Sequence, residues 1–453
     1  MSNAQKIVIS FLIVIFTGSI LLSLPISQTA TSDATYFDHL FISVSAVCVT
    51  GLFIESIFDT YNIFGQFIMM CLIQIGGLGL MSFISILYFR IGQNVRFKNQ
   101  MAVSDALNNA SLDNIRDWLG NIFKYTFVIE GVGALLFATF FIPQQGFAKG
   151  IFTSIFMAIS AFCNAGFDPL GNVSMIPYQD VPLINFTIMA LIILGGIGFS
   201  VWFDVMDRIK SIDFKQAKIS VKTALRRLSP HTKLALLMTV GLIFIGTVLF
   251  LLVEWNNQGT IGQMSTGNKI MTAMFQTVTM RTAGFASIDY TLAHPLSNLI
   301  FIVTMFIGGS PGGTAGGLKT TTFALVVMLA VAEIRQKSHI NFAHHTIPMF
   351  IVRKAFAIFL IYITILIFGS GLILLFDTHV DYLYVLFESI SAFATVGVTA
   401  NLTATLTMAS QVIIMILMFV GRIGPMTMFV SLLPNKKKQS QDIQYTTTNI
   451  IIG

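Results

Sequence analysis

Long uninterrupted apolar stretches are the feature that most restricts what this chain can fold into. A helix that crosses a lipid bilayer needs about 20 apolar residues, and Phe67–Tyr88, Leu234–Val253 and Ala355–Phe376 reach that length. Of the 453 residues, 55% are hydrophobic and 10% are charged, whereas soluble domains are roughly 25% charged. The sequence therefore predicts an all-α protein that crosses the lipid bilayer several times. It excludes a soluble enzyme and a secreted disulfide scaffold.

Four segments of the chain resemble one another. In each, a helix-length apolar stretch ends in a small or hydroxylated cluster, one glycine and an apolar residue. The glycines, Gly51, Gly166, Gly284 and Gly397, follow one another at steps of 115, 118 and 113 residues. A second glycine motif begins 24 to 29 residues after each of them, at residues 76–79, 195–198, 308–311 and 421–424. This order predicts four copies of one unit, at residues 1–123, 124–231, 232–352 and 353–453.

Each unit is predicted to contain a long span, a short apolar helix, the glycine turn and a second long span. The short helices begin near Asp38, Lys149, Lys269 and Asp381. At about a dozen residues they are too short to cross a bilayer, so we expect half-helices that enter and leave on the same side. The predicted architecture has eight transmembrane helices in four repeats of span, half-helix, loop and span around a central pore.

Basic residues indicate the orientation. All but five of the 26 lysines and arginines (Lys149, Lys269, Arg281, Lys319 and Arg422) fall in segments that the topology places on one side. Cytoplasmic loops carry such an excess, so both termini are predicted to be cytoplasmic. The net charge of +6 then reflects topology, and nucleic acid is not an expected partner.

Acidic residues gather on the opposite side, near the glycine turns. Loop solvation explains most of them, and the functional alternative is a vestibule that attracts cations. They are Asp33, Asp38, Glu55, Asp59, Asp168, Asp180, Glu254, Asp289, Asp377 and Asp381.

A glycine turn at membrane depth exposes backbone carbonyls that lipid cannot satisfy, so it must be buried in protein or line a water-filled path. Four such turns meeting on an axis could replace the hydration shell of a cation, and the half-helices would point their partially negative ends at it. The sequence thus predicts a cation filter. Its residues are Val49, Thr50, Gly51, Asn164, Ala165, Gly166, Thr282, Ala283, Gly284, Thr395, Val396 and Gly397.

These turns resemble the four filter loops of the Trk/Ktr/HKT superfamily of potassium transport proteins, and Thr395-Val396-Gly397 resembles the start of a potassium-channel filter. The resemblance covers essentially the whole chain and is greatest to the membrane subunit of a bacterial Ktr potassium uptake system. In that superfamily the filter glycines are associated with potassium selectivity, and a serine in the first loop with sodium preference. Glycine at all four positions here implies that potassium is the transported ion and binds at the filter backbone.

The second motif of the third unit departs from the others. Its glycines and proline cannot form a stable helix, because glycine costs about 1 kcal/mol and proline about 3 kcal/mol at interior positions. In the superfamily an intramembrane loop at this level is the gate. Close helix packing is the alternative, although it leaves the proline unexplained, and a phosphate-binding loop does not fit inside a span. The residues are Gly308, Gly309, Ser310, Pro311, Gly312, Gly313, Thr314, Ala315, Gly316, Gly317 and Lys319.

Three charged residues inside spans or turns need separate interpretations. Arg422 stands where the other units have glycine, and its donors could hold carbonyls of the closed loop. A tie to Glu130 or to a helix end is the alternative. Arg281 is expected to act as scaffold behind the filter, paired with an acid such as Glu388. Glu130 itself is a weak candidate for proton or sodium coupling.

The predicted function is potassium-selective cation translocation across the cytoplasmic membrane of a bacterium, and no constellation of residues supports catalysis. The alternative is a secondary transporter of another solute, a class that usually has two inverted halves. The resemblance implies a homodimer and a separate cytoplasmic ring of nucleotide-binding regulatory subunits. Sodium is a candidate coupling or activating ion. The apolar end Ile450–Gly453 could pack against the partner subunit, or it could be a disordered tail.

Overall fold

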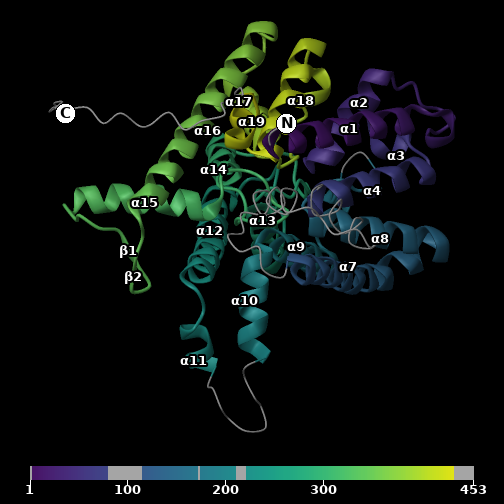
Figure 1. Cartoon of the computed structure of the whole chain (residues 1–453). Helices are drawn as coiled ribbons and strands as arrows, with labels where there is room; N and C mark the ends of the chain where they lie inside the picture. The colour runs from purple at the N-terminus through teal and green to yellow at the C-terminus, as the bar shows by residue number, and fades with distance from the viewer. Residues whose placement is uncertain (1–2, 80–114, 172–173, 211–220, 433–453) are drawn as a thin grey trace.

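A computed structural model describes residues 3–79, 115–171, 174–210 and 221–432 (Figure 1). Residues 80–114 and the C-terminal stretch from residue 433 contain several of the basic residues used to predict the orientation, such as Lys436–Lys438, and they lie outside the described residues. The predicted role of Ile450–Gly453 also lies there and stays a prediction.

Four long apolar helices dominate the fold. They are α1 (Asn3–Ser23), α7 (Ile115–Gln145), α12 (Pro230–Glu254) and α16 (Met349–Phe376), and each contains a stretch long and apolar enough to cross a membrane. Ser229 caps α12 by accepting a hydrogen bond from Thr232 N, with Pro230 as the first helical residue. Large apolar side chains on these helices are exposed, for example Leu252 (74%) and Phe368 (68%). Such surfaces suit contact with lipid rather than water.

A short helix follows each long one and packs against it. These are α2 (Tyr36–Cys48), α8 (Phe147–Cys163), α13 (Thr266–Thr279) and α17 (Tyr382–Phe393). Two begin with acidic caps, because Asp38 completes a capping box with Thr35 and Asp381 accepts a hydrogen bond from Leu383 N. The last turns of all four are buried, so the centre of the molecule consists of short helices surrounded by long ones.

The second apolar helices are α4 (Ile63–Leu78), α9 (Pro182–Gly196), α14 (Pro295–Phe306) and α18 (Met408–Ile423). Their ends differ from the sequence prediction, which expected a break in the third unit alone. The chain bends by 99° between α9 and α10 (Phe199–Lys210) and by 97° between α18 and α19 (Pro425–Leu432). Gly198 and Gly424 stand at these bends with φ of 97° and 90°, a conformation that disfavours other residues. The described chain thus has four membrane-length helices, or six if each bent pair is one span.

Two buried carboxylates join the end of a long helix to the start of the second apolar helix that follows it along the chain. Glu254, at the end of α12, accepts hydrogen bonds from His294 N (2.8 Å) and Ser297 Oγ (2.5 Å) at the start of α14. Asp377 follows α16 and accepts from Thr407 N (3.2 Å) and Thr407 Oγ1 (2.9 Å) at the start of α18. These acids fix helix ends, which is a structural role rather than that of a vestibule.

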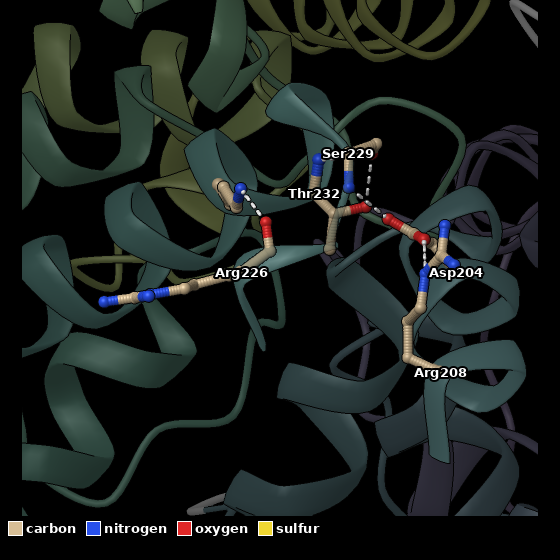
Figure 2. Close-up of polar contacts among 6 residues, drawn as sticks. Asp204, Arg208, Arg226, Ser229 and Thr232 are labelled. Carbon is tan, nitrogen blue, oxygen red and sulfur yellow. Dashed lines mark hydrogen bonds and ion pairs between the residues drawn. The ribbon is translucent and has the colours of Figure 1, made fainter. Parts of the chain in front are cut away.

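At the other side of the molecule, α10 and α11 (Val221–Arg226) project from the body (Figure 1). Figure 2 shows how α10 is tied to the start of α12. Asp204 accepts a hydrogen bond from Ser229 N (2.8 Å) and lies 3.5 Å from Arg208 Nε. The remaining described elements are α3 (Ile57–Thr60), α15 (Thr320–Ile334), the antiparallel strands β1 (Asn341–Phe342) and β2 (His345–Thr346), and 3-10 turns at Pro25–Ser27, Ile176–Tyr178 and Thr403–Thr405.

Candidate ion pathway

The four predicted filter turns share one backbone conformation. The residue two positions before each glycine lies in the left-handed region, which is uncommon for residues other than glycine. The glycine that follows also has a positive φ, so each turn contains two such residues. The pairs are Val49 (56°) and Gly51 (101°), Asn164 (60°) and Gly166 (70°), Thr282 (69°) and Gly284 (85°), and Thr395 (53°) and Gly397 (94°).

The four turns meet each other in a closed ring. At every filter glycine, the position that a Cβ atom would occupy is already taken by backbone of the next turn, so only glycine fits. A Cβ at Gly51 would lie 2.5 Å from Ala165 O, one at Gly166 would lie 2.6 Å from Gly284 Cα, one at Gly284 would lie 2.6 Å from Val396 O, and one at Gly397 would collide with Thr50 O. Segments more than 100 residues apart in sequence therefore bring their carbonyls to one place.

Serine hydroxyls fix two of the turns from behind. Gly51 N donates to Ser45 Oγ (3.0 Å), and Gly397 N donates to Ser391 Oγ (3.1 Å) at the equivalent position. In the third turn the hydroxyl group belongs to a threonine and donates: Thr279 Oγ1 donates to Phe285 O (2.8 Å). These hydrogen bonds use the N–H groups of Gly51 and Gly397 and the carbonyl of Phe285, so they leave the carbonyls of residues 49–51 and 395–397 unused.

The chain between α14 and α15 forms a buried non-helical loop, Ile307–Lys319, as the sequence predicts for this segment. It begins and ends side by side, because Gly308 N donates to Leu318 O (3.0 Å). We call residues 307–319 the intramembrane loop. Tyr362 on α16 donates to Gly317 O (3.2 Å), a contact that no sequence pattern indicated.

Backbone and hydroxyl groups of the second and third units hold the intramembrane loop. Ser310 N donates to Gly196 O (2.9 Å), and Thr314 N donates to Gly195 O (3.1 Å). Gly316 N donates to the hydroxyl of Thr282 (3.1 Å), which belongs to the third filter turn. The loop therefore contacts a filter turn directly, at the level of its left-handed residue.

Arg422 bridges the intramembrane loop and the end of α4. Its Nη1 donates to Thr314 O, while its Nη2 donates to Gly76 O and, at 3.2 Å, to Gly77 O. The carboxylate of Glu130 instead accepts from the Gln74 amide. Of the partners that the sequence left open for Arg422, the loop carbonyl and the helix end are thus both contacted, and the tie to Glu130 is not formed.

The side chain of Lys319 folds back onto the intramembrane loop. Its Nζ donates to Ala315 O (2.7 Å) and lies 3.5 Å from Gly316 O, and in the described part of the chain no carboxylate pairs with it. Among the same residues Arg281 also lacks an acidic partner, which corrects the prediction that it pairs with Glu388. Its Nη2 donates to Thr239 Oγ1 (3.3 Å).

Glu388 stabilises the fourth filter turn instead. Its carboxylate accepts from Ala400 N (2.9 Å), Thr403 Oγ1 (2.8 Å) and the Thr399 hydroxyl, so it fastens α17 to the chain leaving the turn. No sequence pattern distinguishes Glu388 from the other acidic residues. Its donors follow the turn and are recognisable only once the chain has folded back.

The second glycine motif packs the units together in the way that small residues allow. Gly76, Gly195 and Gly421 contact the carbonyls of Val47, Phe162 and Phe393, each four residues before a filter glycine. In the third unit Gly308 contacts Gly316 of its own loop instead. The packing interpretation therefore suits three motifs, and the third differs from them.

Asp168 is the acid nearest in sequence to a filter glycine. It is 8% exposed, and it accepts from Ser174 Oγ (2.7 Å) and Leu170 N (3.1 Å). Burial raises the pKa of Asp168 to about 6, although both hydrogen bonds act in the opposite direction. Its charge therefore changes near neutral pH.

Comparison with known proteins identifies the family that has this arrangement. The family described as TrkH, cation transport protein, matches residues 1–441. The chain belongs to the TrkH family. That family is one of cation transporters and not of enzymes, so the chain is a multi-pass membrane protein of a transport family.

Curated relatives match the TrkH-family chain over its full length. It is 36% identical to Ktr system potassium uptake protein B of Bacillus subtilis, over 99% of this chain and 96% of the relative. It is also 36% identical to potassium/sodium uptake protein NtpJ of Enterococcus hirae, over 100% of this chain and 98% of the relative. The crystal structure of the potassium transporter TrkH from Vibrio parahaemolyticus has the same fold, with a TM-score of 0.71, 18% identity and coverage of 94% of this chain and 84% of that one.

Proposed function

We propose that this protein moves potassium selectively across the cytoplasmic membrane through a filter formed by the four glycine turns. The closed ring of Gly51, Gly166, Gly284 and Gly397 is the observation that carries the proposal. A ring of backbone carbonyls can replace the hydration shell of a permeating ion. The names of the relatives from Bacillus subtilis and Enterococcus hirae agree with potassium as the transported ion.

The residues proposed for the filter are the last three of each turn, 49–51, 164–166, 282–284 and 395–397. The proposed gate is residues 308–317 of the intramembrane loop with Lys319 and Arg422. The hydrogen bond from Gly316 N to Thr282 supports this assignment, because the loop then closes the path next to a filter turn. Two inverted halves would suit the alternative, a transporter of another solute, and four turns in one ring do not favour it.

The architecture that we propose has four units, at residues 1–123, 124–231, 232–352 and 353–453, and eight transmembrane helices. Four long helices, each followed by a short one, support it. We also propose that both termini are cytoplasmic and that α10 and α11 lie on that side, where the basic residues gather.

By analogy with the Ktr relatives, whose names describe a system, we propose a homodimer that works with a separate cytoplasmic ring of nucleotide-binding subunits. Sodium is proposed as a coupling or activating ion, in line with the potassium/sodium name of the Enterococcus hirae relative.

Uptake of each ion tests the proposal directly. Cells that lack their own potassium systems should accumulate potassium when they express this chain, with a Ktr regulatory subunit supplied in a parallel culture. Sodium uptake, measured at the same expression level, should be lower. If neither ion enters under either condition, the proposed function is wrong.

The buried carboxyl group of Asp168 leads us to expect that potassium uptake depends on the pH outside the cell. Its pKa of about 6 means that the carboxylate is ionised at neutral pH and becomes neutral as the pH falls below 6. Loss of a negative charge beside the filter lowers the local cation concentration. Potassium uptake should therefore fall by up to about tenfold, the lower end of such field effects, when outside pH drops from 7.5 to about 5.

Asp168→Asn keeps an acceptor for Ser174 while removing the charge. We expect this variant to take up potassium slowly and at the same rate at both pH values. Asp180→Asn, an exposed acid that accepts from Asn268, is the control and should follow the wild-type curve. An Asp168→Asn protein that keeps the wild-type response to pH would rule out this carboxylate as the cause.

A further inference from the structure

A buried carboxylate inside the second long helix has no role in the pathway described so far. Glu130 on α7 is 4% exposed, and its two oxygens accept from Gln74 Nε2 at 3.1 and 3.3 Å. In the described part of the chain, no lysine, arginine or histidine forms an ion pair with it. A charge in such surroundings is costly unless it is paired, and a carboxyl group avoids the cost by binding a proton.

The carboxyl group of Glu130 lies behind the second filter turn. Cys163, the residue before the left-handed Asn164, has its Sγ 3.9 Å from Glu130 Oε1 and 3.7 Å from Gln74 Oε1. Gly77 packs so closely on Cys163 that a Cβ there would lie 2.5 Å from Sγ. Glu130, Gln74, Cys163 and Gly77 therefore form one tightly packed cluster.

This cluster is continuous with the contacts of Arg422. Gln74 precedes Gly76 by two residues on α4, and the carbonyls of Gly76 and Gly77 accept from Arg422 Nη2. The other end of the same guanidinium donates to Thr314 in the intramembrane loop. Contacts therefore run without a break from Glu130 through Gln74, the end of α4 and Arg422 to the intramembrane loop.

We propose that Glu130 is a proton-binding positioning residue that controls how firmly Arg422 holds the intramembrane loop. This inference rests on the proposed function, in which that loop is the gate. With the proton bound, the carboxyl is neutral and Arg422 stays on Thr314 O. When the proton leaves to water, the carboxylate attracts the guanidinium and competes with Thr314 for it. The loop is then released, so the proton-free form is the more conductive one.

A small cavity offers a route for this proton. It is lined by Thr126, one turn before Glu130 on α7, by the adjacent Ile129, and by Trp202 and Phe203 of α10. It has room for about one water molecule. The hydroxyl of Thr126 is fully buried and has no partner among the described residues, which suits a water. The proton should therefore exchange with the side of the membrane on which α10 lies.

Other titratable or charged groups near Glu130 are few in the described structure. Cys163 faces it from α8, Arg422 reaches the end of α4 from α18, and Tyr125 of α7 lines the cavity. Asp204 on α10, His231 on α12 and Lys319 in the intramembrane loop also carry ionisable groups. The comparison with Glu130→Gln therefore decides whether a response to pH on the α10 side belongs to Glu130.

Potassium flux into liposomes tests the inference when pH is varied on the α10 side and held constant on the other. Flux of the wild-type protein should rise several-fold as the α10-side pH increases. Glu130→Gln, which mimics the neutral carboxyl, should give low flux at every pH. Glu333→Gln, at an exposed position on α15, is the matched control and should behave as wild type.

A second readout does not depend on flux. Infrared difference spectra should contain a carboxylic acid band that responds to pH on the α10 side and is missing in Glu130→Gln. If Glu130→Gln does not fold, Gln74→Met replaces it. That variant removes the donor to the ionised carboxylate, so the flux curve should shift to higher pH.

The outcomes separate this inference from the proposed function. If potassium moves but Glu130→Gln keeps the wild-type pH response, or Gln74→Met leaves the curve in place, the proton site is overturned and the filter is unaffected. If potassium does not move at any pH, the proposed function fails. The infrared band then decides the proton site alone, and its absence from the wild-type spectrum would refute it.

Discussion

Gly397→Ser should nearly abolish potassium uptake. Gly397 has a φ of 94°, and a Cβ atom there would collide with Thr50 O and lie 2.8 Å from Thr50 C and 2.9 Å from Gly51 Cα. All three atoms are backbone of the first filter turn, so no flexible side chain can move aside. We expect an uptake loss of about 10- to 100-fold, which corresponds to about 1.4–2.7 kcal/mol, together with a weaker preference for potassium over sodium.

Gly51→Ser, in the first filter turn, tests the same idea with a smaller expected loss of uptake. A Cβ at Gly51 would lie 2.5 Å from Ala165 O but 3.3 Å from Gly166 Cα, so its collision is confined to one carbonyl. Gly51→Ser should therefore retain more uptake than Gly397→Ser. Its discrimination between potassium and sodium should still be reduced, because the displaced carbonyl belongs to the ring.

Gly146→Ser is the matched control. Gly146 has a φ of 81°, and nothing lies within 4 Å of its Cβ position. Serine there has the same backbone strain, about 1–3 kcal/mol, without any contact with the ring. Radioactive or flame-photometric uptake at equal surface expression should be close to wild type for Gly146→Ser. Unchanged uptake and ion preference in Gly397→Ser would mean that the glycines serve packing and not permeation.

The short helices and their turns could be predicted from the sequence because the signals for them are local. The predicted starts at Asp38, Lys149 and Lys269 fall inside α2, α8 and α13, and Asp381 is the cap of α17. A small or hydroxylated cluster ending in glycine specifies a helix end and a tight turn within eight residues. The break in the third unit was also predictable, because several glycines and a proline in succession disfavour the interior of a helix.

Pairing between distant segments could not be predicted. Arg281 was expected beside an acid, but the donors to Glu388 are Ala400, Thr403 and Thr399, which the fold brings back against α17. The sharp bends at Gly198 and Gly424 were missed for a different reason. The sequence indicates a break in the third unit alone, whereas Gly198 and Gly424 of the second glycine motif also adopt a positive φ where the chain turns.

Arg422→Ala is the second substitution with a large expected effect, and it should raise the flux of the resting protein. The guanidinium donates to Thr314 O on one side and to Gly76 O and Gly77 O on the other, so alanine removes the link between loop and α4. A hydrogen bond from a charged group contributes about 1.5–3 kcal/mol. The backbone contacts of Ser310 and Thr314 with α9 remain, and we expect an increase on the order of tenfold.

Arg422→Lys distinguishes charge from bridging, because an ammonium cannot hold two groups of carbonyls in the way that a planar guanidinium does. We expect its resting flux to lie between those of wild type and Arg422→Ala. Arg227→Ala, an exposed arginine in the basic segment before α12, is the control and should leave flux unchanged. Thermal unfolding in detergent, measured on the same preparations, separates the two roles that the contacts allow. If Arg422 merely fastens a helix end, the alanine variant should unfold at a lower temperature with equal or lower resting flux, and that result would exclude the loop as the structure that it holds shut.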